Sequence, residues 1–240
     1  MESIQSVVQI VQNYVQNESD PRKIVDALKQ GIHQEAKFRY TDRVDAQGLP
    51  LNPEELFLHG LLKTKNGYCM TLSLIYLIVG ERLNLPLYGV ALPNHFFVRY
   101  DSPDYRVNIE TTQNGAILPD RFYFERFGVS EKTLFFMKNL NKKQTLGAYF
   151  SNVGTVYYKQ NRTKQAVFYL ELATRINSNS LEALNNLGNM YSELKQYDKA
   201  IVQYEAALKV NPTNTATLFN LGIANNDLGN AGKAVESYLQ

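Results

Sequence analysis

The chain has 240 residues, 44% of them hydrophobic and 20% charged, a balance that excludes wholesale disorder. Its formal net charge of +2 gives no electrostatic reason to expect a nucleic acid or a membrane surface as a partner. A single cysteine, Cys69, excludes an intramolecular disulfide and a cysteine-rich zinc site. We see no signal peptide and no apolar run of about 18 residues, so the sequence predicts a cytoplasmic protein.

The N-terminal part of the chain predicts helices joined by polar segments. Apolar residues recur at helical spacing over residues 3–17. Asp20-Pro21 is typical of a helix N-cap and first turn, and Asn52-Pro53 repeats this signal. We therefore expect a second helix after Asp20 and a short third helix that ends near residue 62.

A break at Gly67 precedes the most informative segment. From about Cys69 to Leu83 nearly every residue is apolar or small, which predicts a buried central helix. Cys69 would then lie at a helix N-terminus, where partial positive charge stabilises a thiolate. Lys63 and Lys65, just upstream, would add positive charge at the same place.

The chain after Pro86 predicts a strand over residues 87–91 and then a hairpin. Two β-rich runs, 95–100 and 105–111, are separated by the turn-forming residues 101–104. This spacing predicts an antiparallel pair with a four-residue loop.

The register of this hairpin would bring an imidazole to a carboxylate. A four-residue loop pairs Tyr100 with Tyr105 and, further along, His95 with Glu110, whose Cβ atoms would lie roughly 5 Å apart. Asn108 falls on the same face, because side chains alternate with a period of two. A slip of one residue would separate His95 from Glu110.

Residues 119–140 are rich in phenylalanine and tyrosine. We interpret this aromatic run as packing between the two halves of the chain rather than as a binding site. Ser130 is typical of an N-cap and predicts a helix through about Leu140.

A period of 34 residues organises the C-terminal part of the chain. It relates three glycines, Gly154, Gly188 and Gly222. Each unit has the pattern of two amphipathic helices joined by a short turn, and it resembles the tetratricopeptide repeat. We place the repeats at 147–180, 181–214 and, incomplete, 215–240. The resemblance implies an all-α solenoid over 141–240, after an N-terminal domain at 1–140.

Asparagine recurs at the same interval, at Asn152, Asn186 and Asn220. A side-chain amide both donates and accepts a hydrogen bond, so a row of amides could hold an extended peptide backbone. In tetratricopeptide proteins this position faces the concave groove, which implies a protein or peptide partner. The alternative is that asparagine is simply tolerated on a polar helix face.

Cys69, His95 and Glu110 could form one chemical unit. A thiolate attacks carbonyl carbon, and a neighbouring histidine takes its proton and later delivers it to the leaving amine. A carboxylate on the other ring nitrogen fixes the tautomer. Taken singly, each residue also has a structural explanation: a core cysteine, a satisfied histidine or a surface glutamate. The predicted register favours the site.

Three segments strengthen this interpretation: Asn66-Gly67-Tyr68-Cys69 through Leu83, Leu85–Val90 and Pro93–Arg99. They resemble the transglutaminase-like superfamily, in particular its bacterial branch that carries C-terminal tetratricopeptide repeats. The resemblance implies an α+β, papain-like core with Cys69 as nucleophile and His95 as base. Glu110 would be the third member, where the family has aspartate. Asn108 is the alternative third member, because an amide serves in some papain-like enzymes.

Two functions remain compatible with the sequence. The first is a thiol-dependent acyl transfer on a protein substrate: amide or isopeptide hydrolysis, deamidation or transamidation. The second is a non-catalytic scaffold whose repeats bind extended peptides. We expect no cofactor and no metal, since His33, His59 and His95 lack metal-ligand spacing. The sequence does not indicate an oligomeric state.

Overall fold

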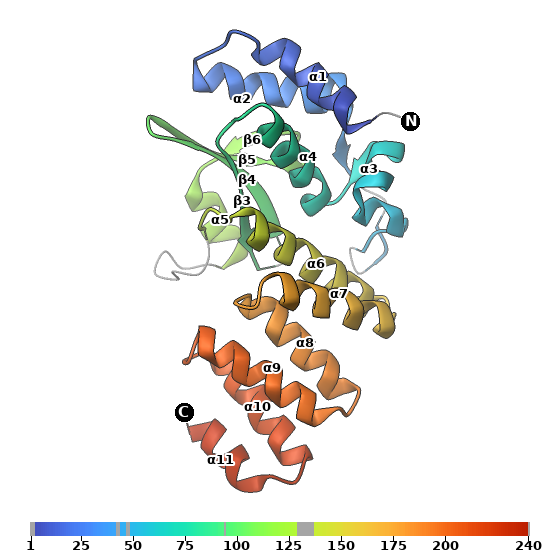
Figure 1. Ribbon diagram of the computed structural model, residues 1–240, viewed down its shortest axis with the longest axis vertical. Coiled ribbons are helices and arrows are strands. Elements are labelled where there is room, and N and C mark those ends of the chain that lie inside the picture. Colours follow the sequence, from blue (N-terminus) through green and yellow to red (C-terminus); the bar gives the residue numbers. More distant parts are fainter. Residues whose placement is uncertain (1–2, 42–43, 47–48, 94, 129–136, 240) are drawn as a thin grey trace. The chain divides into compact units, whose positions relative to one another are not determined.

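The computed structural model describes residues 3–41, 44–46, 49–93, 95–128 and 137–239. The chain divides into two compact units, Met1–Asn141 and Lys142–Gln240 (Figure 1). The first unit combines helices with an antiparallel sheet, and the second is entirely helical. An α+β region followed by an all-α repeat region is therefore confirmed.

The first unit opens with short helices whose ends follow the predicted caps. Asp20 accepts a hydrogen bond from the Arg22 backbone N–H, and Asn52 accepts one from that of Glu54. The elements are α1 (Ile4–Val15), α2 (Pro21–Lys29), the π-helix η1 (Gln30–Glu35), β1 (Arg39–Tyr40), the 3₁₀ helix η2 (Pro53–Leu56), α3 (Leu58–Thr64) and β2 (Asn66–Gly67).

The single short helix expected after Asn52 is in fact two elements, η2 and α3. Phe57 between them is extended, with φ −119° and ψ 152°, which breaks the helix. Gly60 explains how closely the two pack: a Cβ there would lie 2.0 Å from the Glu54 carbonyl oxygen. Only glycine permits this approach.

Helix α4 (Cys69–Arg82) is the centre of the first unit, and its predicted start and burial are confirmed. It lies against α1 on one side and the sheet on another (Figure 1). Its apolar side chains belong to one core cluster with residues of α1, α2 and the sheet, among them Val7, Leu28, Leu72, Ile75 and Ile109.

Four strands form an antiparallel sheet in the order β3-β4-β5-β6, and β1 pairs in parallel with β2. The strands are β3 (Leu87–Leu92), β4 (His95–Ser102), β5 (Tyr105–Glu110) and β6 (Ala116–Leu118). The short helix η3 (Thr111–Gln113) joins β5 to β6, and α5 (Asp120–Phe127) follows.

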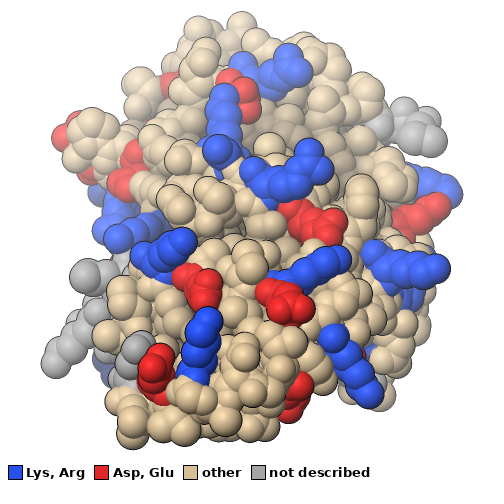
Figure 2. Space-filling model, turned by 60° about the horizontal axis from the view of Figure 1, so that its bottom comes forward, with Lys and Arg blue, Asp and Glu red and all other residues tan. Residues whose placement is uncertain are grey.

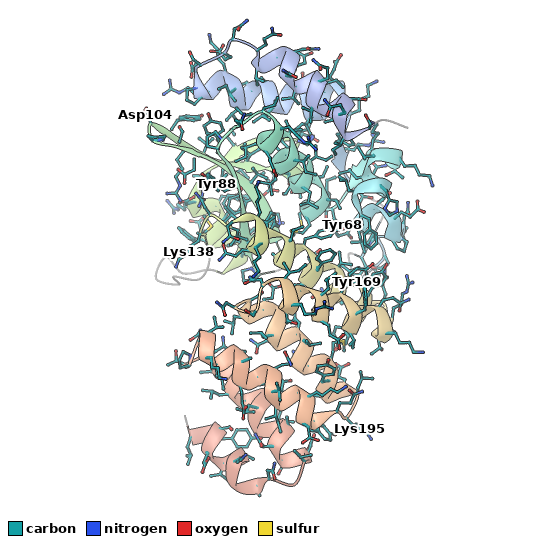
Figure 3. The ribbon with its side chains drawn as sticks, in the orientation of Figure 1. Tyr68, Tyr88, Asp104, Lys138, Tyr169 and Lys195 are labelled. Atoms are coloured by element: carbon teal, nitrogen blue, oxygen red, sulfur yellow. The ribbon has the colours of Figure 1, made fainter. Side chains whose placement is uncertain are left out.

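The predicted hairpin register was wrong by two residues. Ser102 pairs with Tyr105 and Arg99 with Asn108, so the turn contains only Pro103 and Asp104 (Figure 3 labels Asp104 at its tip). The strand continues further than expected, and Ser102 Oγ donates to the Tyr105 carbonyl oxygen at 3.1 Å where the two strands meet the turn. An even shift leaves every side chain on its predicted face.

The aromatic segment packs on the sheet of the first unit. Phe122, Tyr123 and Phe127 belong to a cluster with the sheet residues Val90 and Phe97. Of the helix expected from Ser130, residues 129–136 lie outside the described part of the chain. The remainder is not helical: the Leu140 N–H donates to the Gly89 carbonyl oxygen at 2.9 Å.

The second unit consists of helix pairs in which small residues allow close approach. A Cβ at Gly154 would lie 2.7 Å from Leu170 Cγ, and one at Gly188 would lie 2.5 Å from the Tyr204 ring. The helices are α6 (Lys142–Lys159), α7 (Thr163–Ile176), α8 (Leu181–Glu193), α9 (Tyr197–Val210), α10 (Thr215–Asp227) and α11 (Ala231–Leu239).

Two further features concern the surface and the length of the helices. None of the helices within the described residues is both long and apolar enough to cross a membrane. On the face drawn in Figure 2, basic and acidic side chains are interspersed rather than separated by sign.

Candidate active site

Cys69 is the first residue of α4, and a network of hydrogen bonds holds this helix start in place. The Tyr68 N–H donates to Thr71 Oγ1 at 2.8 Å, and the Thr71 hydroxyl reaches the Glu55 carbonyl oxygen at 3.1 Å. A Cβ at Gly67 would lie 2.7 Å from Thr71 Oγ1, so the glycine makes room for this cap. Cys69 as a whole is 7% exposed.

His95 and Glu110 are joined by a short, buried hydrogen bond. His95 Nε2 donates to Glu110 Oε2 at 2.8 Å, and their side chains are 11% and 1% exposed. The other carboxylate oxygen of Glu110 accepts from the Thr112 N–H at 3.0 Å and from its hydroxyl at 2.6 Å. The carboxylate is therefore fixed from both sides.

The Cys69 thiol belongs to the same group, because it lies close enough to the His95 ring to raise the pKa of that ring. Because Glu110 occupies Nε2, Nδ1 is the nitrogen left for the thiol. Burial is the largest single influence on the His95 pKa and lowers it. The bonds to Cys69 and Glu110, and their charges, outweigh burial and raise the pKa to about 9. A ring that is positive at neutral pH stabilises negative charge on sulfur.

Glu110 responds in the opposite sense. Burial raises the pKa of its carboxyl group, but the hydrogen bond and charge of His95 and the two bonds from Thr112 bring that pKa below its usual value. The carboxyl group is therefore ionised at neutral pH, where the imidazolium is also present.

Aromatic rings fix the plane of the His95 imidazole. The Phe127 ring stacks on it with a centroid distance of 4.5 Å and an interplanar angle of 10°. Tyr123 and Phe97 lie further out, at 6.3 and 6.5 Å. Burial and the nearby charge of Glu110 raise the pKa of the Tyr123 hydroxyl. The aromatic run interpreted as packing thus also contributes Phe127 to this site.

Asn108, the alternative third member, is occupied elsewhere. Its carbonyl oxygen accepts from Arg99 Nε at 2.8 Å, and its amide donates to Asp120 Oδ1 at 2.6 Å. The side chain that contacts His95 Nε2 is Glu110. The contacts therefore favour Glu110 over Asn108 for the orienting role.

The two upstream lysines make contacts with other groups. Lys63 Nζ pairs with Glu54 Oε2 at 3.2 Å, and Lys65 Nζ lies 4.5 Å above the Phe38 ring. Positive charge near the sulfur comes instead from His95 and from the start of α4.

Two tyrosines stand beside the start of α4 (Figure 3 labels Tyr68). The Tyr40 ring lies 5.7 Å from that of Tyr68 at an angle of 50°, and Tyr40 is 39% exposed. The pairing of β1 with β2 puts Tyr40 opposite Gly67, two residues before Cys69. The sequence analysis missed Tyr40, Thr112 and Phe127, because no local pattern marks them as neighbours of Cys69 or His95.

The periodic asparagines of the second unit bond from one repeat to the previous one. Asn186 Nδ2 donates to Thr155 Oγ1 at 3.1 Å, and Asn220 Nδ2 donates to Asn189 Oδ1 at 3.0 Å. Asn152, at the equivalent position of α6, is half-buried. These bonds tie neighbouring repeats together.

The described residues contain no group of three or more histidine, cysteine, aspartate or glutamate side chains arranged to hold a metal ion.

Comparison with known families identifies both parts of the chain. A family model described as "Transglutaminase-like superfamily" matches residues 1–127. Two models of the tetratricopeptide repeat match residues 148–180 and 181–214.

Curated relatives match over part of their length. F-box only protein 21 of Mus musculus is 31% identical over 78 residues, which cover 32% of this chain and 12% of the relative. A UPF0162 protein of Buchnera aphidicola subsp. Baizongia pistaciae (strain Bp) is 28% identical over 118 residues, 49% of this chain and 42% of the relative. The chain thus spans less than half the length of both relatives.

Among solved structures, that of YrrB, described as "a TPR protein with an unusual peptide-binding site", is 30% identical. The match covers 38% of this chain and 47% of YrrB, with a TM-score of 0.37. The crystal structure of MamA is 23% identical over 40% of this chain and 56% of MamA, with a TM-score of 0.38.

Proposed function

Because the chain belongs to the transglutaminase-like superfamily and carries tetratricopeptide repeats after that domain, we propose that it transfers acyl groups from an amide of a protein substrate through the Cys69 thiol. One observation carries the proposal: Glu110 holds the His95 ring at 2.8 Å, and the Cys69 thiol is close enough to that ring to raise its pKa. This is the arrangement that nucleophilic thiol chemistry requires.

In the first step, Cys69 Sγ attacks the carbonyl carbon of the amide. His95 holds the thiol proton and delivers it to the leaving amine as the C–N bond breaks. The product that stays on the enzyme is a thioester. Glu110 keeps the His95 ring in place and balances its positive charge, and the stacked Phe127 limits ring rotation.

In the second step, water or an amine attacks the thioester, and His95 accepts its proton as Sγ leaves. Water gives hydrolysis or deamidation, and an amine gives transamidation. The backbone N–H of Cys69, at the start of α4, is the natural donor to the oxyanion of both tetrahedral intermediates.

The repeats would hold the protein substrate or a scaffold near the first domain. YrrB is described as having a peptide-binding site. In this chain, Asn152, Asn186 and Asn220 are the candidate peptide contacts. The amide N–H groups of Asn186 and Asn220 already bond to the preceding repeat, which leaves their carbonyl oxygens for a peptide N–H.

The first test is alkylation of the full chain with iodoacetamide from about pH 5 to about pH 9, read by mass spectrometry. We expect Cys69 to react at about pH 6, where an ordinary thiol is almost inert, and His95→Gln to slow that reaction at least about tenfold. Glu110→Gln should have a smaller effect in the same direction. Glu125→Gln, which neutralises an exposed carboxylate on α5, is the control and should change nothing.

A His95→Gln protein that labels at the wild-type rate at every pH would rule out activation of the thiol. If Cys69 is labelled at acidic pH but no protein substrate is turned over, the thiol is activated and the proposed acyl transfer is contradicted.

The second candidate, a scaffold without catalysis, is favoured by the low exposure of Cys69, 7%. It predicts that Cys69→Ala retains all function, whereas acyl transfer predicts complete loss. Peptide binding by the repeats is tested by Asn186→Ala combined with Asn220→Ala, for which we expect about a tenfold loss of affinity. Unchanged peptide affinity in a folded double variant would reject the asparagine row as a binding surface.

A further inference from the structure

The proposed acyl transfer places negative charge on the carbonyl oxygen of the substrate in both of its steps. Hydrogen-bond donors that point at this oxygen lower the barrier, and such sites usually direct more than one donor at it. As the first residue of α4, Cys69 presents a backbone N–H that has no acceptor within the helix, and this group is one donor. A second donor has to come from a side chain close to the start of α4.

Strand β1 fixes Tyr40 beside this helix start. The parallel pairing with β2 puts Tyr40 opposite Gly67, and the Thr41 N–H donates to the Gly67 carbonyl oxygen at 3.0 Å, which anchors the backbone directly after the tyrosine. The same strand packs against α4 and against η3, the short helix that follows Glu110. Tyr40 therefore adjoins both the segment that carries the thiol and the segment that carries the carboxylate.

The Tyr40 ring lies on the side of the site. Its centroid is 5.7 Å from that of Tyr68, the residue before Cys69. Burial is the largest influence that raises the pKa of the Tyr40 hydroxyl, and the charges of Cys69 and Glu110 raise this pKa further. Because the energy between charges falls with distance, this influence indicates that the hydroxyl is near both groups. A raised pKa also keeps the hydroxyl protonated at neutral pH, so it can donate.

This hydroxyl is also accessible and available. Tyr40 is 39% exposed, although Cys69 beside it is only 7% exposed. Within the described part of the chain, no hydrogen bond uses the Tyr40 hydroxyl. The hydroxyl of Thr112, in contrast, already donates to the Glu110 carboxylate at 2.6 Å. Of these two hydroxyl groups, only that of Tyr40 can donate to a substrate without giving up an existing bond.

We propose that Tyr40 is a catalytic residue whose hydroxyl donates to the substrate carbonyl oxygen, together with the Cys69 N–H. This assignment rests on the proposed acyl transfer. As Sγ bonds to the carbonyl carbon, the π electrons of the C=O bond move to oxygen, and both donors stabilise the oxyanion while the tyrosine keeps its proton. The C=O bond then re-forms, the C–N bond breaks, and His95 protonates the leaving amine. Because these hydrogen bonds strengthen as charge develops, they act mainly on the rate.

The test compares two reactions of Cys69, the single cysteine of the chain. The thiolate attacks iodoacetamide at its CH₂ carbon and expels iodide, so no oxyanion forms. It attacks p-nitrophenyl acetate at the carbonyl carbon, which forms an oxyanion, and p-nitrophenolate then leaves the acetyl thioester on sulfur. Because the phenolate departs without a proton, this ester separates stabilisation of the oxyanion from proton delivery by His95.

Both rates are measured on the full chain by mass spectrometry, with Cys69→Ala as the blank. Tyr40→Phe removes only the hydroxyl and keeps the ring beside Tyr68, so it should leave alkylation unchanged. We expect it to slow acetylation at least about tenfold, as the loss of an oxyanion donor does. Tyr88→Phe is the matched control, because Tyr88 is on β3 of the same unit and is 37% exposed (Figure 3), and it should change neither rate.

Acetylation of Tyr40→Phe at the wild-type rate overturns the assignment. Equal slowing of alkylation and acetylation also overturns it, because the hydroxyl would then act on the thiol rather than on the oxyanion. So does an equal loss of acetylation in Tyr88→Phe. Failure of the proposed acyl transfer gives a different result: wild-type Cys69 then alkylates like an ordinary thiol or forms no acetyl thioester, and the role of Tyr40 is rejected together with that function.

Discussion

The two units of this chain use their residues in different ways. In the repeat unit the same contact recurs: Asn186 bonds to Thr155, and Asn220 bonds to Asn189 in the next repeat. In the first unit each important contact occurs once, as between His95 and Glu110. A contact that recurs at a fixed interval can be recognised in the sequence. A site made of contacts that each occur once is harder to recognise, because it depends on how segments distant in the sequence pack together.

This contrast predicts that single substitutions have larger effects in the first unit than in the repeats. Arg99 is the strongest case, because it is 1% exposed and bonds to Asn108, Asn139, Asp120 and the Met137 carbonyl oxygen. Arg99→Met should destabilise the first unit by about 3 kcal/mol, because it removes four hydrogen bonds of a buried guanidinium group and leaves the buried Asn108 carbonyl oxygen without its donor. Hydrogen exchange resolved by segment would measure the loss.

Arg106→Met is the control for this prediction. Arg106 lies 3.8 Å from the same Asp120 carboxylate but its side chain is 50% exposed, so we expect a loss of about 1 kcal/mol or less. Comparable losses for Arg99 and Arg106 would contradict the importance of burial here.

The next effect is the pH dependence of the His95–Glu110 pair. The folded-state pKa of His95, about 9, lies above its unfolded value of 6.5. The stabilisation is therefore fully present below about pH 6.5 and is lost as the pH rises through about 9. It should amount to something on the order of 2 kcal/mol.

The measurement is the free energy of unfolding of wild type and His95→Gln in denaturant, at about pH 6 and about pH 10. We expect the two proteins to differ more at the lower pH. A difference that grew toward alkaline pH would have the wrong sign for a histidine stabilised as a cation.

The smallest effect concerns the repeats. A Cβ at Gly188 would meet the Tyr204 ring at 2.5 Å, so Gly188→Ala should destabilise its helix pair by about 1–2 kcal/mol. Gly232, in α11, has no heavy atom within 4 Å of the same position. Gly232→Ala should instead stabilise that helix by about 0.5 kcal/mol.

Segment-resolved hydrogen exchange would show whether the two alanines act in opposite directions and only near their own repeat. A loss from Gly188→Ala that spread evenly over all helices of the repeat unit would contradict the local character assigned to its contacts.

The difference between the units also explains what could be predicted from the sequence. The 34-residue period located the helix pairs because each contact is repeated. The start of α4 was predictable because Gly67 and the apolar run after Cys69 are local signals. Such signals depend only on neighbouring residues.

Contacts between distant segments were harder to predict. The hairpin loop length was wrong, since the pairing of Ser102 with Tyr105 depends on how the turn packs. Thr112, which bonds to Glu110, and Phe127, which stacks on His95, were not identified. Their roles follow from side-chain positions in the folded chain, which the spacing of residues along the sequence does not indicate.

The two-residue turn at Pro103 and Asp104 has a consequence for how this hairpin can change in length. An insertion or deletion that moves the pairing by two residues keeps His95 and Glu110 on a common side of the sheet. An insertion or deletion of one residue within the paired part of the two strands would move either His95 or Glu110 to the opposite side of the sheet. Natural variants of the hairpin should therefore differ by even numbers of residues, or confine an odd one to its tip.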